Sequence, residues 1–382
     1  MRIAKYIVAG LLLFVTSMGI TYGIAQLVGK YNSKIVSPVA TPGVKVKAPK
    51  IDPAIPRTEI CPINGLLYPK SYKDIWSTRR PLAVMIENHL DSRPLSGLSS
   101  ADLVYEAVAE GGITRQMGIF LCDIAGQNIT LAPVRSARIY YTKLVTEYDA
   151  LYNHVGGAGN CDDPTVNEQA KALCFIRRNK IKDMDQFGLD FKSCHRLTNR
   201  LDQEVAYEHT MACFTEELYK TAVKRDWQND GEWEKTFVPW TFKDEGKERG
   251  NVTDISFEFW RNKPDYNVSW KYSASDNTYI RSNGGKEVID LNTQDPIKAK
   301  NIVIQFAKEF GPLDEHLHMD YQITGTGKAI FFQDGKAING TWSKLSPLVR
   351  TKFMADGKEF IFNRGQTWVE IVPDGNIIEY NK

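Results

Sequence analysis

The protein has almost no net charge, which argues against nucleic acid as a partner. Its 48 Lys and Arg residues are balanced by 46 Asp and Glu residues, for a formal net charge of +2. Nucleic-acid-binding domains usually carry a clear basic excess on one face. We therefore expect no nucleic-acid partner.

Several motifs of known chemistry are also missing. The segment His154–Gly159 matches neither nucleotide-binding glycine pattern, and no Gly-x-Ser-x-Gly sequence is present. No Cys-x-x-Cys pair exists, and His316 and His318 lack an obvious third ligand. We expect no cofactor and no metal, and the sequence leaves open whether the protein is an enzyme.

Six cysteines lie in the first half of the part expected to be exported, at positions 61, 122, 161, 174, 194 and 213. An even number of cysteines permits up to three disulfides in an oxidising compartment, with 15 full pairings among six. The alternative is that some of them remain buried thiols. The sequence does not choose between these pairings.

The first 30 residues contain a long apolar segment. No charged side chain lies between Lys5 and Lys30, and a bilayer-spanning helix needs about 20 apolar residues. We predict a transmembrane anchor in residues 1–30, since the apolar run continues past the cleavage-like Gly23-Ile24-Ala25 of the alternative, a secretory signal. Both interpretations export the rest of the chain, so we expect a single-pass protein of the bacterial cell membrane with its globular part outside the cytoplasm.

Residues 31–57 form a Pro- and Lys-rich segment with five prolines. Such a segment has too few large apolar residues to fold, and an extended polyproline-like tether is expected.

The remaining chain shows two patterns. Continuous apolar runs at 81–86, 103–105 and 117–121, followed by helix-type spacing after Pro133, predict a mixed-sheet α/β domain over residues 58–235. Period-two alternation at 255–259, 268–272 and 302–306 predicts a β-rich domain over residues 240–382. We expect Trp342 and Trp368 to pack in the core of that second domain.

Ordered motifs give the chain a resemblance to a known family. They are the segments 80–89, 93–98, 101–106, 110–115, 133–138 and 154–157, and in the C-terminal half 325–327, 334–336, 340–344 and 365–368. Over roughly residues 60–375 the sequence resembles the YerB-like lipoprotein family, a two-domain family of the bacterial cell envelope with unknown function. That family commonly has a lipid-bearing cysteine after its signal sequence, whereas here no cysteine precedes Cys61. The resemblance then implies that a protein helix replaces the lipid.

The strongest candidate for ligand binding is the segment 133–138. Arg135 and Arg138 lie three residues apart where a loop is expected to become a helix, and a helix start favours anions. Arg115 is a further candidate. The alternative is that these arginines form structural ion pairs with Asp or Glu residues.

A second group of candidates lies at predicted strand ends. His154, Gly156 and Gly157 follow one apolar strand, and Asn88 and His89 follow another. If the two strands are parallel, their carboxyl ends lie at one edge of the sheet and bring the two histidines near each other. The alternatives are a tight turn for the glycines and structural hydrogen bonds for the histidines.

Our preferred hypothesis is an envelope protein that binds an anionic ligand or polymer through Arg115, Arg135 and Arg138 with the neighbouring strand ends. The first alternative is a hydrolase or phosphotransferase acting on such a polymer, with His89 or His154 as the acid-base group and Asp102 or Glu110 holding a cation. The second is a protein-protein scaffold.

Overall fold

The computed structural model describes residues 54–381. The predicted anchor, residues 1–30, and most of the predicted tether, 31–57, lie outside the described residues. Within 54–381, no helix has the length and apolar character needed to cross a membrane. The predicted fold class is corrected accordingly: residues 54–381 form a mixed α/β fold with a β-rich C-terminal part, and no membrane-spanning helix is among them.

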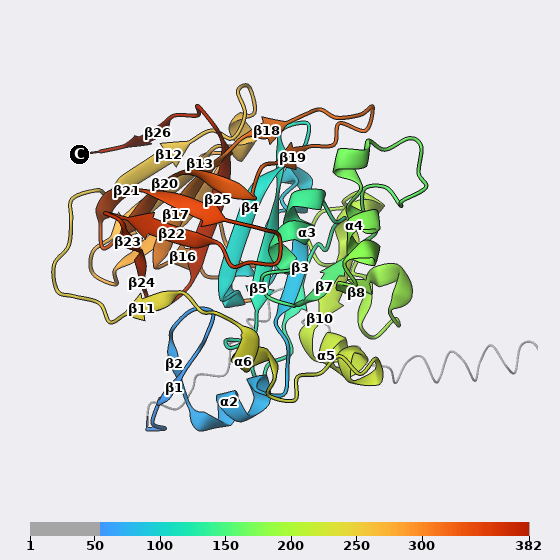
Figure 1. Cartoon of the computed structure of the whole chain (residues 1–382), viewed down its shortest axis with the longest axis horizontal. Helices are drawn as coiled ribbons and strands as arrows, with labels where there is room; N and C mark the ends of the chain where they lie inside the picture. The colour runs from blue at the N-terminus through green and yellow to red at the C-terminus, as the bar shows by residue number, and fades with distance from the viewer. Residues whose placement is uncertain (1–53, 382) are drawn as a thin grey trace, which may run out of the picture. The chain divides into compact units, whose positions relative to one another are not determined.

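An 11-stranded mixed sheet forms the centre of the described chain, and strands from both halves of the sequence contribute to it (Figure 1). The parallel pairs are β17–β25, β25–β4, β3–β7 and β7–β8, and the pairs β4–β5 and β5–β3 between them are antiparallel. In sheet order the strands are β23 (Lys358–Glu359), β22 (Lys352–Ala355), β21 (Lys336–Lys344), β20 (Gly325–Gln333), β17 (Asn301–Ala307), β25 (Thr367–Pro373), β4 (Leu103–Glu110), β5 (Ile113–Phe120), β3 (Leu82–Glu87), β7 (Leu151–His154) and β8 (Lys182–Asp185).

Strands β3 and β25 are mostly apolar because both of their faces are covered. Every residue of β3 and of β25 is buried. Strands buried on both faces lose the polar alternation of a half-exposed strand, which is why the run at 81–86 predicted one correctly.

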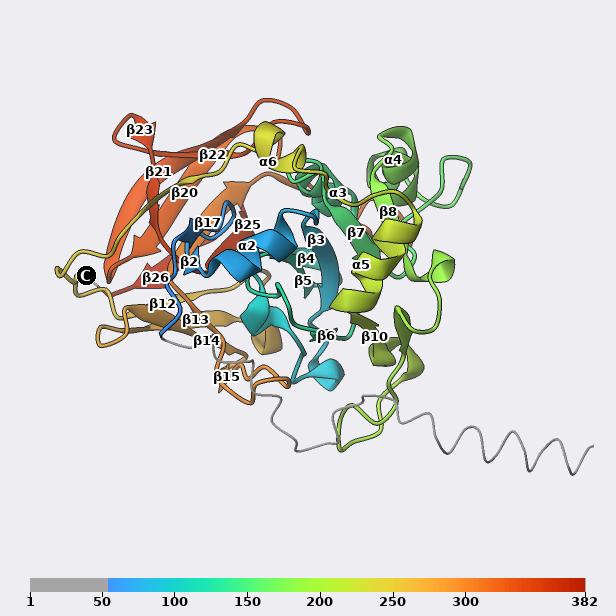
Figure 2. The same cartoon turned by 90° about the horizontal axis from the view of Figure 1, so that it is seen from below.

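A second, six-stranded sheet packs against the large one (Figure 2). Trp270 on β13 contacts Trp368 on β25 with ring centroids 5.3 Å apart, and Trp342 and Trp368 are both buried, which confirms their predicted core packing. Residues of β13 alternate between buried and more exposed, as the period-two pattern predicts for a strand covered on one face. The strands are β15 (Lys286–Glu287), β14 (Thr278–Asn283), β13 (Val268–Ser273), β12 (Asp254–Phe257), β26 (Ile378–Tyr380) and β16 (Lys298–Ala299), the last paired with β14.

The described helices are short, and the α-helices among them all lie before residue 237. Helix α3 packs on the large sheet through two tyrosines, whose hydroxyl groups donate to the backbone oxygens of Val108 and Arg115. The helices are α2 (Lys70–Trp76), α3 (Ile139–Val145), α4 (Ala172–Arg178), α5 (Thr215–Lys224) and α6 (Trp233–Thr236), with 3-10 turns η1 (Leu90–Ser92), η2 (Leu98–Ser100), η3 (Glu168–Ala170), η4 (Gln186–Gly188), η5 (Tyr207–Thr210) and η6 (Pro264–Tyr266).

Small sheets complete the fold. They pair β1 (Glu59–Ile60) with β2 (Leu67–Tyr68), β6 (Thr130–Leu131) and β9 (Cys194–Arg196) with β10 (Met211–Phe214), β11 (Thr241–Lys243) with β24 (Ile361–Asn363), and β18 (Glu309–Phe310) with β19 (Asp320–Tyr321).

All six cysteines are paired, which confirms the predicted disulfides. The bonds join Cys61 to Cys122, Cys161 to Cys174, and Cys194 to Cys213. The first spans 61 residues of sequence, and the third joins the neighbouring strands β9 and β10. This pairing is one of the 15 that the sequence allowed.

Candidate anion-binding site

The predicted strand ends do meet at one edge of the large sheet. Strands β3 and β7 are parallel, and the segment that carries the arginines lies beside both of them. The Arg135 N–H donates to the Met85 oxygen of β3 (2.9 Å), and the Ala137 N–H donates to the Gly156 oxygen after β7 (2.9 Å). The arginine segment and the glycine loop are therefore in direct backbone contact.

The arginines themselves are placed differently from the prediction. Helix α3 begins at Ile139, and Arg138 has extended backbone angles at its N-cap position (φ −129°, ψ 148°). A helix does begin at this point, as predicted, but both arginines precede it, so they do not share a face of its first turn. Extended backbone is needed here because residues 134–137 bridge to strand residues on both sides.

Arg138 and Arg115 converge on Glu110. Arg115 donates one terminal nitrogen to Glu110 Oε2 (2.9 Å) and the other to the Ser136 oxygen (3.0 Å), while Arg138 binds Glu110 and the Ala137 oxygen. Burial alone would raise the pKa of Glu110, but the charges of Arg115 and Arg138 outweigh it and lower that pKa. Burial, together with the nearby Arg115 charge, lowers the pKa of Arg138 to about 10. Two guanidinium groups thus share one carboxylate.

Arg135 points to a different carboxylate. Its Nε lies 3.0 Å from Oε1 of Glu87, and the arginine side chain is 26% exposed while that of Glu87 is only 5% exposed. Its two terminal nitrogens donate no hydrogen bond to the described part of the chain. Arg135 therefore differs from Arg115 and Arg138 in having free donors near the surface.

The other ligand-binding candidates are occupied by the protein itself. The Asn88 amide donates to Glu106, Thr114 and Asn283. A Cβ atom on Gly157 would lie 2.9 Å from a Leu173 methyl group, so this glycine is required for packing against the chain's own side chains.

The two histidine candidates have separate surroundings. His154 is fully buried, with Nδ1 2.8 Å from the Gly156 oxygen and Nε2 3.0 Å from Asp183 Oδ1. His89 is the N-cap residue of η1, and its Nδ1 accepts a hydrogen bond from the Asp91 N–H (3.3 Å). The parallel strands are as predicted, but each histidine has its own partners.

Comparison with known proteins identifies the family. Residues 70–228 match the N-terminal domain, and residues 255–369 the C-terminal domain, of the DUF3048 proteins of unknown function. The chain is 30% identical over 314 residues to "Putative lipoprotein YerB" of Bacillus subtilis (strain 168), covering 82% of this chain and 86% of that protein. This chain belongs to the YerB-like family.

The crystal structure of YerB from Bacillus subtilis shares the fold of this YerB-like chain. It superposes with a TM-score of 0.69 at 27% sequence identity, covering 84% of this chain and 100% of that one. The family models describe proteins of unknown function, so the chemistry of the YerB-like chain has to be argued from its own residues.

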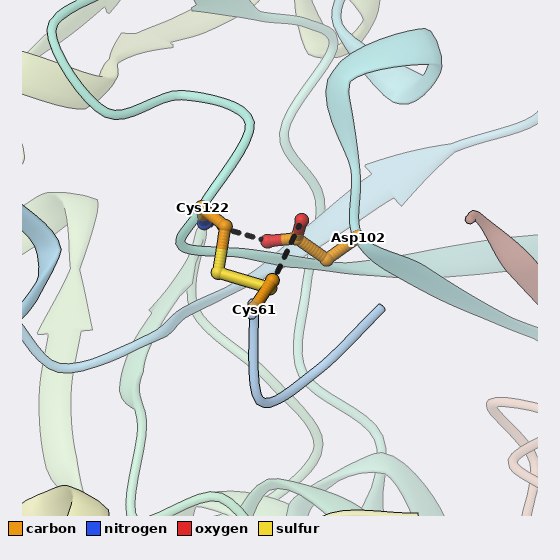
Figure 3. A group of neighbouring side chains, drawn as sticks. All are labelled: Cys61, Asp102 and Cys122. Carbon is orange, nitrogen blue, oxygen red and sulfur yellow. Dashed lines mark hydrogen bonds between the residues drawn. A yellow bond between two sulfur atoms is a disulfide. The ribbon is translucent and has the colours of Figure 1, made fainter. Parts of the chain in front are cut away.

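Asp102, a predicted cation ligand, lies instead beside a disulfide of this YerB-like chain. Figure 3 shows its carboxylate against the Cys61–Cys122 bond. The carboxylate accepts hydrogen bonds from the N–H groups of Leu121 (2.7 Å) and Cys122 (2.9 Å) and from the Asn64 amide (2.5 Å). Because both neighbouring sulfurs are in a disulfide, they offer no thiolate to a metal.

Burial, aided by the Asp123 charge, raises the pKa of Asp102 from 3.8 to about 7, against the lowering effect of the backbone N–H donors. A raised carboxyl pKa stabilises the folded state fully below pH 3.8, and this contribution is lost as the pH rises through 7. We expect the free energy of unfolding to fall between pH 5 and pH 8, and the fall to be smaller in Asp102→Asn by on the order of 2 kcal/mol. Urea titrations at several pH values measure the difference, and parallel profiles for the two proteins would contradict it.

Sequence reasoning missed several charged residues that the fold brings to this region. Glu87 was not singled out as the partner of Arg135, and His209, which binds Glu87, lies 122 residues further along the chain. Neither residue belongs to a motif with a recognisable spacing. Their proximity depends on the packing of η5 beside the end of β3.

Proposed function

We propose that this protein resides in the cell envelope, outside the cytoplasm, and binds a phosphate-bearing anionic ligand at Arg135. The observation that carries the proposal is the guanidinium group of Arg135, which is 26% exposed and keeps both terminal nitrogens free of partners within the described residues. A guanidinium with two free donors matches the paired oxygens of a phosphate group.

The charge around Arg135 supports an anion. Three arginines, at positions 115, 135 and 138, face the two carboxylates of Glu87 and Glu110. Burial lowers the pKa of Arg135, and the nearby Arg115 charge lowers it further, although Glu87 acts in the opposite direction. A bound anion would take the free donors of Arg135, whose charge Glu87 and Glu208 offset without occupying them.

The location has its own support. Three disulfides are typical of an oxidising compartment, and the relative from Bacillus subtilis is named as a lipoprotein. The catalytic alternative has less structural support, since two of its candidate residues, His154 and Asp102, are buried and hydrogen-bonded within the fold. No comparable observation favours a scaffold, and the absence of a nucleic-acid partner stays a prediction.

The test is titration of the full-length protein with inorganic phosphate and with a glycerol-phosphate oligomer, followed by calorimetry. Charge-assisted hydrogen bonds contribute about 1.5–3 kcal/mol, so Arg135→Ala should weaken binding roughly 10- to 100-fold. The affinity of Arg135→Lys should lie between those of the wild type and Arg135→Ala, because lysine keeps the charge and loses the paired donor geometry. Thermal stability should change little, since Glu87 keeps His209 as a partner.

The matched control is Arg178→Ala, which removes an exposed arginine at the end of α4 and should leave binding unchanged. A neutral glycan of similar length should not bind. Equal affinity of the Arg135→Ala and wild-type proteins would contradict the proposal, as would a failure of the wild-type protein to bind either phosphate probe.

A further inference from the structure

A group of metal-ligating side chains lies where β3 ends, on the other side of Glu87 from Arg135. His89 and Asp91 belong to the loop around η1, and His209 belongs to η5, just before β10. One ligand atom from each of the three residues lies within 4.8 Å of the other two. The two imidazole rings are stacked, with centroids 4.6 Å apart and an interplanar angle of 15°.

Glu87 holds His209 in the orientation that a metal requires. Its Oε2 lies 2.8 Å from Nδ1 of His209, and both side chains are largely buried. A carboxylate that accepts the Nδ1–H of an imidazole leaves the lone pair on Nε2, the arrangement found behind many zinc-bound histidines. The Nε2 atom of His209 has no hydrogen-bond partner within the described residues.

His89 and Asp91 present the remaining ligands toward solvent. The side chain of His89 is 30% exposed and that of Asp91 is 63% exposed, so an ion and its bound water can enter. The Asp91 N–H donates to Nδ1 of His89, so this lone pair is already used. Binding of an ion requires the partly exposed His89 ring to turn away from the Asp91 N–H and from its stacked position beside His209. An ion pair with Glu87 accounts for His209 and an N-cap bond accounts for His89, but neither accounts for the convergence of both rings with the Asp91 carboxylate.

We infer that His89, Asp91 and His209 form a divalent-metal site that takes Zn²⁺, with Glu87 as the residue that orients His209. Two imidazoles and one carboxylate are a zinc-type ligand set, whereas calcium and magnesium prefer all-oxygen sites. Three protein ligands leave a coordination position open, as in catalytic zinc sites. The inference differs from the sequence-based expectation of no metal, and it does not depend on anion binding at Arg135.

The charges near the site suit a cation. Glu87 and Asp91 supply two negative charges. Arg135 faces Glu87 rather than the cluster, and Arg200, which also acts on Glu87, donates its terminal nitrogens to the backbone oxygens of Pro94 and Ser92.

The experiment measures zinc binding to the full-length protein, purified without a histidine tag and stripped with a chelator. We expect one equivalent of Zn²⁺ by calorimetry and by elemental analysis after dialysis, and a visible ligand-field spectrum with Co²⁺. His89→Ala and Asp91→Ala should each weaken zinc binding at least about 100-fold, and Glu87→Gln about 10- to 100-fold through the orientation of His209. His89 and Asp91 are partly exposed loop residues, so these variants remain informative if His209→Ala does not fold.

The control is the double variant His316→Ala/His318→Ala. This pair also has neighbouring rings, 5.6 Å apart, and His318 binds Asp314, but among the described residues the ligand atoms of these three side chains do not all lie within 4.8 Å of one another. The control should bind zinc as tightly as the wild type. The inference is overturned if the control loses the metal, if Asp91→Ala and His89→Ala both keep wild-type affinity, or if the wild type binds no stoichiometric zinc. Loss of phosphate binding in Arg135→Ala would not bear on it.

Discussion

Replacing Arg281 by Met is expected to lower the free energy of unfolding by about 3–5 kcal/mol, the cost of removing one partner from a buried ion pair. Arg281 lies on β14 with no exposed surface, and its terminal nitrogens donate to Glu106 on β4 (2.5 Å) and Glu370 on β25 (2.8 Å). Its guanidinium carbon lies 4.5 Å from the ring centroid of Trp368. The substitution would leave two carboxylates facing each other without a cation.

The protonation of this group explains why one arginine suffices for two carboxylates. Burial raises the pKa of Glu370 to about 8, Arg281 opposes the rise, and the Glu106 charge adds to it. The raised pKa favours the protonated form of Glu370, which lessens the excess of negative charge around the single arginine. Without Arg281, ionisation of either carboxylate in this dry interface becomes more costly.

Chemical denaturation of the Arg281→Met protein measures the loss. Adding Glu106→Gln and Glu370→Gln to the same protein should recover at least half of it, because the repelling charges are then gone. The control is Lys298→Met, which breaks the exposed pair with Asp276 (2.8 Å) and should cost less than about 1 kcal/mol. A loss as small as this for Arg281→Met would show that the pair does not hold the two sheets together.

Removing the Cys61–Cys122 disulfide should lower the free energy of unfolding by about 4 kcal/mol, which is the second large effect that we expect. The bond closes 61 residues of chain, and loop-closure entropy for a loop of that length predicts about 4 kcal/mol. Both cysteines are fully buried and contact Asp102, so their truncation also removes packing. The variant Cys61→Ala/Cys122→Ala, unfolded in urea beside the wild type, tests the value.

The matched comparison is Cys161→Ala/Cys174→Ala, which opens a bond with a sequence separation of 13 and should cost about 3 kcal/mol. The expected order is therefore a larger loss for the longer loop. The reverse order would indicate that native-state contacts, rather than the unfolded chain, dominate the effect of these bonds.

Parts of the candidate site could be predicted because they lie next to each other in sequence. The paired arginines and the glycine loop after His154 are separated by a single helix, and parallel pairing of β3 and β7 places them side by side. What could not be predicted is which carboxylate each arginine meets. Glu87 and Glu110 reach them from β3 and the end of β4, through a register that no local pattern encodes.

The sequence by itself determined the apolar runs that became β3, β4 and β5, the alternating strands of the C-terminal half, the capacity for three disulfides and the YerB-like family. These features depend on the spacing of side chains within a short segment, because that spacing alone decides which side chains share a face of a strand or helix. Only the tertiary structure decided that β25 lies between β17 and β4, which cysteines pair, and that His209 reaches His89. Each of these contacts joins segments far apart in the chain, where the burial of whole faces, and not the local period, selects the partner.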